Sequence, residues 1–238
     1  MADSYTVTDF FRTIVARMYS RNVAEVQREI TLFKIGEGGW EGSPKVPKTP
    51  SAAREDLESE GEPLAGGGKV VFMTGSFQVV GLGTSFLSDV TPGQWVKPGP
   101  ASSVVSNYYS AGEPGTEYDD WGQVLSVTDD ENLVLSSVYT GASCFVNDVR
   151  ECYKASTPLF TFRKTLAAGD VLWGTATGVD VAVLVDFAEA NATQLGVAPA
   201  FFEVGLFDSD GCMVAYGTFD ERTKTVGVQI ILPLSIGF

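Results

Sequence analysis

The sequence has no histidine among its 238 residues. Histidine is the commonest general base in enzymes and the commonest protein ligand of transition metals. Its absence excludes a Ser-His-Asp triad and leaves any catalysis to carboxylates, lysine, tyrosine or thiols. No serine stands in a Gly-x-Ser-x-Gly nucleophile elbow. We therefore expect a protein that is not an enzyme and that needs neither a cofactor nor a metal ion.

Positive charge is also scarce, because 16 Lys and Arg residues face 30 Asp and Glu residues, for a net charge of −14. A nucleic-acid surface needs clustered Lys and Arg to neutralise phosphates, so no nucleic-acid partner is expected. No apolar run approaches the roughly 20 residues that cross a bilayer. The N-terminal MADSYTVTDFF lacks the basic and apolar regions of a signal peptide. The sequence thus predicts a soluble protein with no membrane insertion.

Cysteine is rare, and Cys144, Cys152 and Cys212 form neither a C-x-x-C pair nor a zinc-binding spacing. Their odd number favours reduced thiols in a cytosolic setting. A Cys144–Cys152 disulfide across the short loop between them is the alternative. The sequence leaves both possibilities open.

Short β-branched and aromatic segments make up most of the chain, and glycine, proline and aspartate separate them. Such spacing is typical of small barrels and sandwiches. Two of these segments flank the turn Asp208-Ser209-Asp210-Gly211 and predict a hairpin. The expected fold is mainly β, with an N-terminal helix and two small β barrel or sandwich modules, one inserted in the other.

One helix is expected near the N-terminus, where apolar residues recur at intervals of three and four. These residues are Val7, Phe10, Phe11, Ile14, Val15 and Met18. The apolar face packs either on its own domain or on a neighbouring subunit. With this helix, residues 1–40 contribute a first strand at Ile30–Ile35 that joins the C-terminal module.

The rest of the chain divides into three parts. Residues 41–67 are rich in Pro, Gly, Ser and charge and predict a flexible linker or arm. Residues 68–145 predict an inserted small β barrel, and residues 146–238 a C-terminal β sandwich. A long loop within the barrel carries tyrosines and acids that are candidates for contact with a partner. The candidate assembly residues are Phe10, Phe11, Ile14, Met18, Trp40, Tyr108, Tyr109 and Trp121.

Three sets of motifs, in this order along the chain, carry a resemblance to a known class of proteins. The first is Phe33-Lys34-Ile35-Gly36-Glu37-Gly38-Gly39-Trp40. The second is Gly68-Lys69-Val70, Thr74-Gly75-Ser76, Val79-Val80-Gly81-Leu82-Gly83-Thr84-Ser85-Phe86 and Pro92-Gly93, followed by Val124-Leu125-Ser126-Val127, Leu133-Val134-Leu135 and Tyr139-Thr140-Gly141. The third is Phe202-Glu203-Val204-Gly205-Leu206-Phe207-Asp208-Ser209-Asp210-Gly211, Ala215-Tyr216-Gly217-Thr218-Phe219 and Lys224.

The middle set resembles a recurrent module of tailed-phage virion proteins, and the flanking sets resemble tail-collar and tail-fibre attachment proteins. The resemblance implies a structural subunit of the virion, assembled in the bacterial cytoplasm, in the tail, collar, neck or baseplate. It implies other virion proteins as partners and a homo-oligomer such as a ring or trimer. The chain has no long repetitive shaft, which favours a compact adaptor over a fibre.

Two other functions are open. The tyrosine-rich loop is a candidate for binding host-surface glycan. The acidic clusters Asp119-Asp120, Asp129-Asp130 and Asp208/Asp210 are candidates for Ca²⁺ or for a glycan-cleaving carboxylate pair. They match no EF-hand spacing, and hairpin turns solvated by carboxylates explain them more simply.

Overall fold

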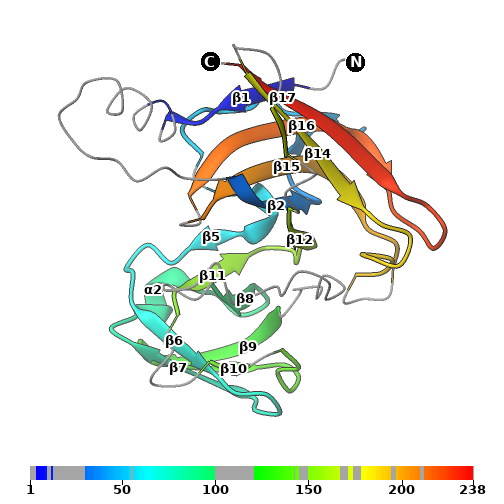
Figure 1. The fold of residues 1–238 in the computed structure, drawn as a ribbon. Helices are drawn as coiled ribbons and strands as arrows, with labels where there is room; N and C mark the ends of the chain where they lie inside the picture. Colours follow the sequence, from blue (N-terminus) through cyan, green and yellow to red (C-terminus); the bar gives the residue numbers. More distant parts are fainter. Residues whose placement is uncertain are drawn as a thin grey trace. The chain divides into compact units, whose positions relative to one another are not determined.

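The computed structural model describes residues 4–9, 12, 30–54, 56–99, 121–141, 143–144, 150–166, 171–173, 178–193, 197–209 and 212–237. Within them the protein is mainly β, with several antiparallel sheets (Figure 1). The chain divides into two compact units. The split unit contains Met1–Ser59 and Phe160–Phe238, and the inserted unit contains Glu60–Val104 and Tyr118–Leu159. Each unit is described by itself.

The larger sheet of the split unit has five strands in the order β1-β16-β15-β2-β12. They are β1 (Ser4–Val7), β16 (Met213–Thr223), β15 (Ala200–Asp208), β2 (Ile30–Gly36) and β12 (Thr161–Thr165). The predicted hairpin is β15 and β16, which pair from Ala200↔Thr223 to Phe207↔Met213. β2 pairs with both β15 and β12, so a strand from before residue 60 lies between two strands from after residue 159.

A second sheet of the split unit has the order β13-β14-β17, formed by β13 (Val171–Trp173), β14 (Gly178–Val185) and β17 (Ile230–Gly237). Val181, Val183 and Val185 are buried and alternate along β14, as expected for a strand with one face on a core. They belong to one apolar cluster with Phe33 and Phe162 of the larger sheet. Burying each such side chain contributes roughly 1.5–3 kcal/mol, so this shared core holds the sandwich-like unit together.

The N-terminal segment differs from the predicted helix. Ser4–Val7 form β1, which pairs with the edge of β16 from Ser4↔Thr218 to Val7↔Ala215. Val7 is therefore a strand residue, because the backbone of β16 offers it a ladder of hydrogen bonds. Asp9 and Arg12 are helical, and among the described residues Arg12 N donates to the carbonyl of Thr8 at 3.1 Å. Phe10, Phe11, Ile14, Val15 and Met18 lie outside the described residues.

The segment predicted as a linker or arm, 41–67, carries short structured elements. They are β3 (Trp40–Glu41), β4 (Val46–Pro47), the 3-10 turn η1 (Glu58–Glu60) and β5 (Glu62–Pro63). Its two leucines, Leu57 and Leu64, are 1% and 5% exposed. The low apolar content of this stretch predicts flexibility. The segment is ordered because ion pairs and backbone hydrogen bonds, in addition to these two side chains, hold it in place.

The inserted unit has a seven-stranded sheet in the order β5-β11-β8-β9-β10-β7-β6. Its strands besides β5 are β6 (Lys69–Phe72), β7 (Gln78–Leu82), β8 (Trp95–Pro98), β9 (Gly122–Asp129), β10 (Asn132–Leu135) and β11 (Cys152–Ala155), and α2 spans Phe86–Asp89. The unit has its own apolar core, which includes Val70, Phe72, Phe86 and Leu133.

The predicted barrel is not closed. β5 and β6 lie at the two ends of the strand order, and no ladder joins them in the part of the chain that the structure describes. Two isolated bridges, Val70↔Arg150 and Phe72↔Cys144, connect β6 to the chain before β11. Closure of a barrel requires a continuous hydrogen-bonded register, which two isolated bridges do not provide.

Among the described residues, none of the helices is both long enough and apolar enough to cross a bilayer.

Candidate functional site

Trp40 lies at the start of the segment that follows β2, and it is half-buried. Its indole Nε1 donates to the carbonyl of Glu37 at 2.8 Å, which fixes the ring. The ring centroid lies 6.4 Å from that of Phe202 and 4.3 Å from Lys45 Nζ. Trp40 thus keeps part of its surface accessible beside a cation.

Trp121, which was expected around the tyrosine-rich loop as an assembly residue, is buried. The residue is only 2% exposed, and its indole Nε1 donates to the carbonyl of Leu159 at 3.3 Å. Lys97 Nζ lies 4.7 Å from the ring centroid and 2.5 Å from the carboxylate of Glu60. The indole covers a buried ion pair, so it has almost no surface left for a partner.

The other candidate assembly residues, Phe10, Phe11, Ile14, Met18, Tyr108 and Tyr109, lie outside the described residues.

A buried carboxylate, Glu203 in β15, is the centre of the polar interior of the split unit. Its Oε1 accepts from Ser59 N at 2.8 Å, and its Oε2 accepts from Glu58 N at 2.9 Å and from Tyr216 Oη at 2.9 Å. Glu203 is 0% exposed, and this burial raises the pKa of its carboxyl, although the three donors act in the opposite direction. Burial also raises the pKa of the Tyr216 hydroxyl, and the nearby Glu203 raises it further.

Two glycines, Gly36 at the end of β2 and Gly38 just after it, make room for this carboxylate. A Cβ atom on Gly36 would lie 1.9 Å from Ser59 Oγ and 2.8 Å from Glu203 Oε1. A Cβ atom on Gly38 would lie 2.5 Å from the same Oε1. Both positions need glycine because a buried carboxylate and the η1 backbone approach β2 closely.

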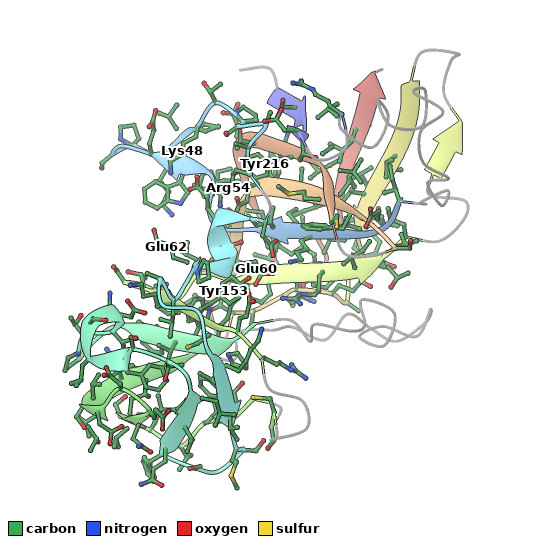
Figure 2. The ribbon with its side chains drawn as sticks, turned by 90° about the vertical axis from the view of Figure 1, so that its left-hand side faces the viewer. Lys48, Arg54, Glu60, Glu62, Tyr153 and Tyr216 are labelled. Atoms are coloured by element: carbon green, nitrogen blue, oxygen red, sulfur yellow. The ribbon has the colours of Figure 1, made fainter. Side chains whose placement is uncertain are left out.

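Ion pairs stabilise the segment between Trp40 and Ser59, and the first of them joins it to β2. Lys34 Nζ lies 2.7 Å from both carboxylate oxygens of Asp56. Glu58 pairs with Lys48 at 2.7 Å and with Arg54 at 3.3 Å. The Arg54 guanidinium lies 5.6 Å from the centroid of the Tyr216 ring, so it covers the same tyrosine that binds Glu203 (Figure 2).

A second carboxylate, Glu37, joins three segments of the split unit. Its Oε2 accepts from Phe160 N at 3.0 Å, and its Oε1 accepts from Ala200 N at 2.9 Å. These donors precede β12 and begin β15. One side chain after β2 therefore fixes the starts of both strands that pair with β2.

A buried lysine, Lys224, joins the turns at the end of β16. Its Nζ donates to Asn191 Oδ1 at 2.6 Å and lies 3.4 Å from the carbonyls of Phe187 and Thr225. Burial lowers the pKa of this amine, while the negative charges of Glu189 and Asp186 partly offset that effect. Lys224 is 0% exposed, and its amine contacts loop carbonyls and one side-chain amide oxygen.

The turn Gly81-Leu82-Gly83-Thr84 of the inserted unit is held by hydrogen bonds to backbone carbonyls. Thr84 Oγ1 donates to the carbonyl of Asp130 at 2.6 Å, and Phe86 N donates to the same carbonyl at 3.2 Å. Phe86 is 0% exposed in the core. The turn therefore connects the loop between β9 and β10 to the start of α2, a role in folding.

The thiols and acids give little support to reactive chemistry in the described residues. The three cysteines are thiols and not members of disulfides, and Cys144 and Cys152 are buried. Burial raises the pKa of the Cys152 thiol, and the neighbouring Cys144 adds to this effect. A thiol with a raised pKa is a poor nucleophile. In the parts of the chain that the structure describes, no group of three or more His, Cys, Asp or Glu residues could hold a metal ion.

Sequence reasoning missed Glu37, Glu203, Lys97 and Lys224. A signal for Glu203 exists, since it is a lone charge in the apolar run Phe201–Phe207. A continuous apolar run is typical of a strand that is covered on both faces, so a charged residue within it is expected to be buried.

Comparison of the chain with protein-family models, with curated proteins and with solved structures finds no match.

Proposed function

We propose that the protein is a non-enzymatic structural subunit of a tailed-phage particle. It acts as an adaptor in the tail, collar, neck or baseplate, and it attaches fibres or neighbouring subunits. Its partners are other virion proteins and further copies of itself.

The observation that carries the proposal is the meeting of two motif sets at Glu203. The early set, Phe33 to Trp40, and the late set, Phe202 to Lys224, resemble the two ends of phage attachment proteins. In the split unit, Gly36 and Gly38 of the early set pack against the carboxylate of Glu203 in the late set. Residues that resemble one class of protein thus form one packed unit, as expected if the resemblance reflects a shared fold.

The polar interior also suits a mechanical role. Glu37, Glu203 and Lys224 bind backbone groups of several segments, so their hydrogen bonds connect the sheets to the loops. Hydrogen bonds to charged groups contribute about 1.5–3 kcal/mol each when they are buried. An adaptor that transmits load between neighbouring subunits benefits from loops fixed in this way.

The test is to locate the protein in purified particles. The gene is expressed within its own genome with a short epitope tag, and particles are purified by density gradient and labelled with antibody for electron microscopy. The expected result is label at one level of the tail or neck, and mass spectrometry of the same particles gives the copy number. A protein found only in the lysate and never in particles would overturn the proposal. Binding to a host-glycan array would instead support a receptor-binding role.

A further inference from the structure

The side chain of Lys224 in the split unit is closed to solvent, since the residue is 0% exposed. Its Nζ lies 2.6 Å from Asn191 Oδ1 and 3.4 Å from the carbonyls of Phe187 and Thr225. All three contacts are uncharged oxygen atoms. Among the described residues the amine of Lys224 therefore has polar neighbours but forms no ion pair with a carboxylate.

The acids near Lys224 do not bind its amine. The negative charges of Glu189 and Asp186 act on it from a distance. The Glu189 carboxylate is instead bound by Lys164 Nζ at 2.9 Å and by Asp186 N at 2.8 Å. A lysine is almost never fully buried unless it is paired, because a desolvated ammonium ion is costly. The surroundings of Lys224 therefore favour a nitrogen without a charge, and burial lowers the pKa of this amine.

Asn191 presents its side-chain amide to this amine. Its Nδ2 donates to the carbonyl of Phe187 at 2.9 Å, which fixes the amide with Oδ1 toward Lys224. The amide carbon Cγ is bonded to Oδ1, so it lies no further than about 3.8 Å from Lys224 Nζ. Reacting atoms in a near-attack conformer are about 3–3.5 Å apart. The carbonyl of Phe187 contacts both nitrogens, so the amine and the amide are held beside one another.

The backbone positions both side chains. Lys224 N donates to the carbonyl of Pro199 at 2.9 Å, which fixes the start of the lysine side chain. Ala190, directly before Asn191, is buried and has a φ of 50°, and it is the one non-glycine residue of the described chain with a positive φ. A strained conformation of this kind persists only where the surrounding structure fixes it, and such residues cluster at functional sites.

We infer that Lys224 and Asn191 join through an isopeptide bond that forms within the folded protein. The neutral amine of Lys224 attacks Cγ of Asn191, as expected of a desolvated lysine nucleophile. A bond forms between Nζ and Cγ, and the bond between Cγ and Nδ2 breaks. One proton passes from Nζ to Nδ2, which leaves as ammonia. Asn191 is half-buried, so water reaches its amide and carries the proton.

The bond links the two sheets of the split unit covalently. Asn191 follows β14 of the three-stranded sheet, and Lys224 follows β16 of the five-stranded sheet. The two residues are 33 positions apart, and the loop that the bond closes contains the hairpin of β15 and β16. The inference goes beyond the proposed function and does not depend on the virion role, although a covalent link suits a part that bears load.

The mass of the full-length protein under denaturing conditions tests for the bond. The wild type is expected to be lighter than its sequence mass by one molecule of ammonia. Lys224→Met and Asn191→Ala are expected to have their full sequence masses, because each lacks one of the two reacting groups. Lys69→Met is the matched control, since it removes a lysine of β6 in the inserted unit and is expected to retain the loss.

Peptide mapping locates the bond. Cleavage after glutamate separates residues 190–203, which contain Asn191, from residues 222–238, which contain Lys224. In the wild type we expect these two peptides as one branched species whose fragmentation assigns the new amide to Nζ of Lys224. Circular dichroism establishes that each variant is folded. The wild-type map needs no variant, so it decides the question even where a substitution prevents folding.

Single-molecule stretching measures the mechanical consequence. The closed loop of 33 positions cannot extend in the wild type, so the unfolded chain is expected to be shorter than that of Asn191→Ala by about 110 Å. Lys69→Met is expected to extend as the wild type does.

Three results would overturn the inference. A wild type with its full sequence mass would mean that hydrogen bonds alone hold Lys224 to Asn191. A loss of ammonia that persists in Lys224→Met would assign the loss to cyclisation of Asn191 on its own backbone. A wild-type map in which residues 190–203 and 222–238 appear only as separate peptides would exclude the bond directly.

Discussion

At the scale of single residues, the charges that matter most are the buried ones. Glu203 is the clearest case, because its carboxylate accepts hydrogen bonds from two backbone N–H groups and one phenol in a site closed to water. A buried donor that loses its acceptor retains the full cost of its own desolvation. The contribution of Glu203 therefore lies in satisfying the η1 backbone more than in its negative charge.

Replacing Glu203 with alanine should destabilise the protein strongly. The change leaves the N–H groups of Glu58 and Ser59 and the Tyr216 hydroxyl without this acceptor and opens a cavity, so we expect the free energy of unfolding to fall by about 3 kcal/mol. Urea denaturation followed by fluorescence measures it. Glu221→Ala, on the exposed end of β16, is the control and should change stability by less than about 0.5 kcal/mol. Equal effects of both substitutions would contradict the role of Glu203.

The pH dependence of stability should carry the signature of the same residue. Burial raises the pKa of the Glu203 carboxyl above its usual 4.5, so the folded protein binds this proton more tightly than the unfolded chain does. The stability that results is fully present below the unfolded pKa and is lost as the pH rises through the folded pKa. Glu203→Gln does not titrate. The free energy of unfolding of the wild type minus that of Glu203→Gln is therefore expected to decrease as pH rises from about 4.5.

Urea denaturation of both proteins at a series of pH values gives this difference, in which the other carboxylates of the acidic chain cancel. A difference that stays constant, or that increases with pH, would show that the carboxyl is ionised as easily in the folded protein as in the unfolded chain.

At the scale of elements, alternation and turn chemistry in the sequence predict most strands. Ile30–Ile35 and the hairpin around residues 208–211 coincide with β2 and with β15 and β16. Each has β-branched or aromatic residues bounded by glycine or aspartate, and both local signals agree. Boundaries are less accurate, since the strand predicted at Ile30–Ile35 extends to Gly36.

Elements whose structure depends on distant partners could not be predicted in this way. Val7 reads as part of an amphipathic helix, but β16 supplies a strand partner more than 200 residues later. Leu57 reads as part of a flexible arm, but Glu203 and Lys34 anchor its neighbours. The buried polar sites around Glu203 and Lys34 depend on the same long-range pairing, so they cannot be predicted from the spacing of residues along the sequence. Trp121 shows the opposite error. It is an aromatic residue beside a long loop, which suggests exposure, but its ring covers Lys97.

Removing β1 should expose the edge of β16. Deletion of residues 1–7 takes away the ladder from Ser4↔Thr218 to Val7↔Ala215, so we expect a loss of about 2 kcal/mol in the free energy of unfolding. Hydrogen–deuterium exchange should become faster at residues 215–218. Residues 178–185 of β14 serve as an internal control and should exchange as before. Unchanged exchange at residues 215–218 would mean that β1 adds no protection to β16.

At the scale of the whole molecule, one unit interrupts the chain of the other. Along the residues that the structure describes, the chain leaves the split unit after Ser59 and returns at Phe160. Thr161 Oγ1 donates to Ser59 Oγ at 2.8 Å, so these two ends lie side by side. Adjacent ends are the condition under which an insertion disturbs the host unit least.

Because the ends meet, the split unit should fold without the inserted one. Joining Ser59 to Phe160 through two glycines is expected to give a protein that unfolds cooperatively in urea. Its m-value should be lower than that of the full chain, since less surface is exposed on unfolding. A matched variant of the joined chain with Glu203→Ala tests whether the buried carboxylate contributes there as in the full protein. A non-cooperative transition in the joined chain would show that the split unit depends on the inserted one.

The contact between Glu203 and Ser59 also has a consequence for the order of events during folding. The two residues are 144 positions apart in sequence, so their hydrogen bond closes a very long loop. Folding of the intervening chain, 60–159, brings its own ends together and shortens the flexible loop to about a third. By the logarithmic dependence of loop entropy on length, this lowers the closure cost by about 1 kcal/mol. If the inserted unit folds first, the split unit can therefore form the contact between Ser59 and Glu203 at a lower entropy cost.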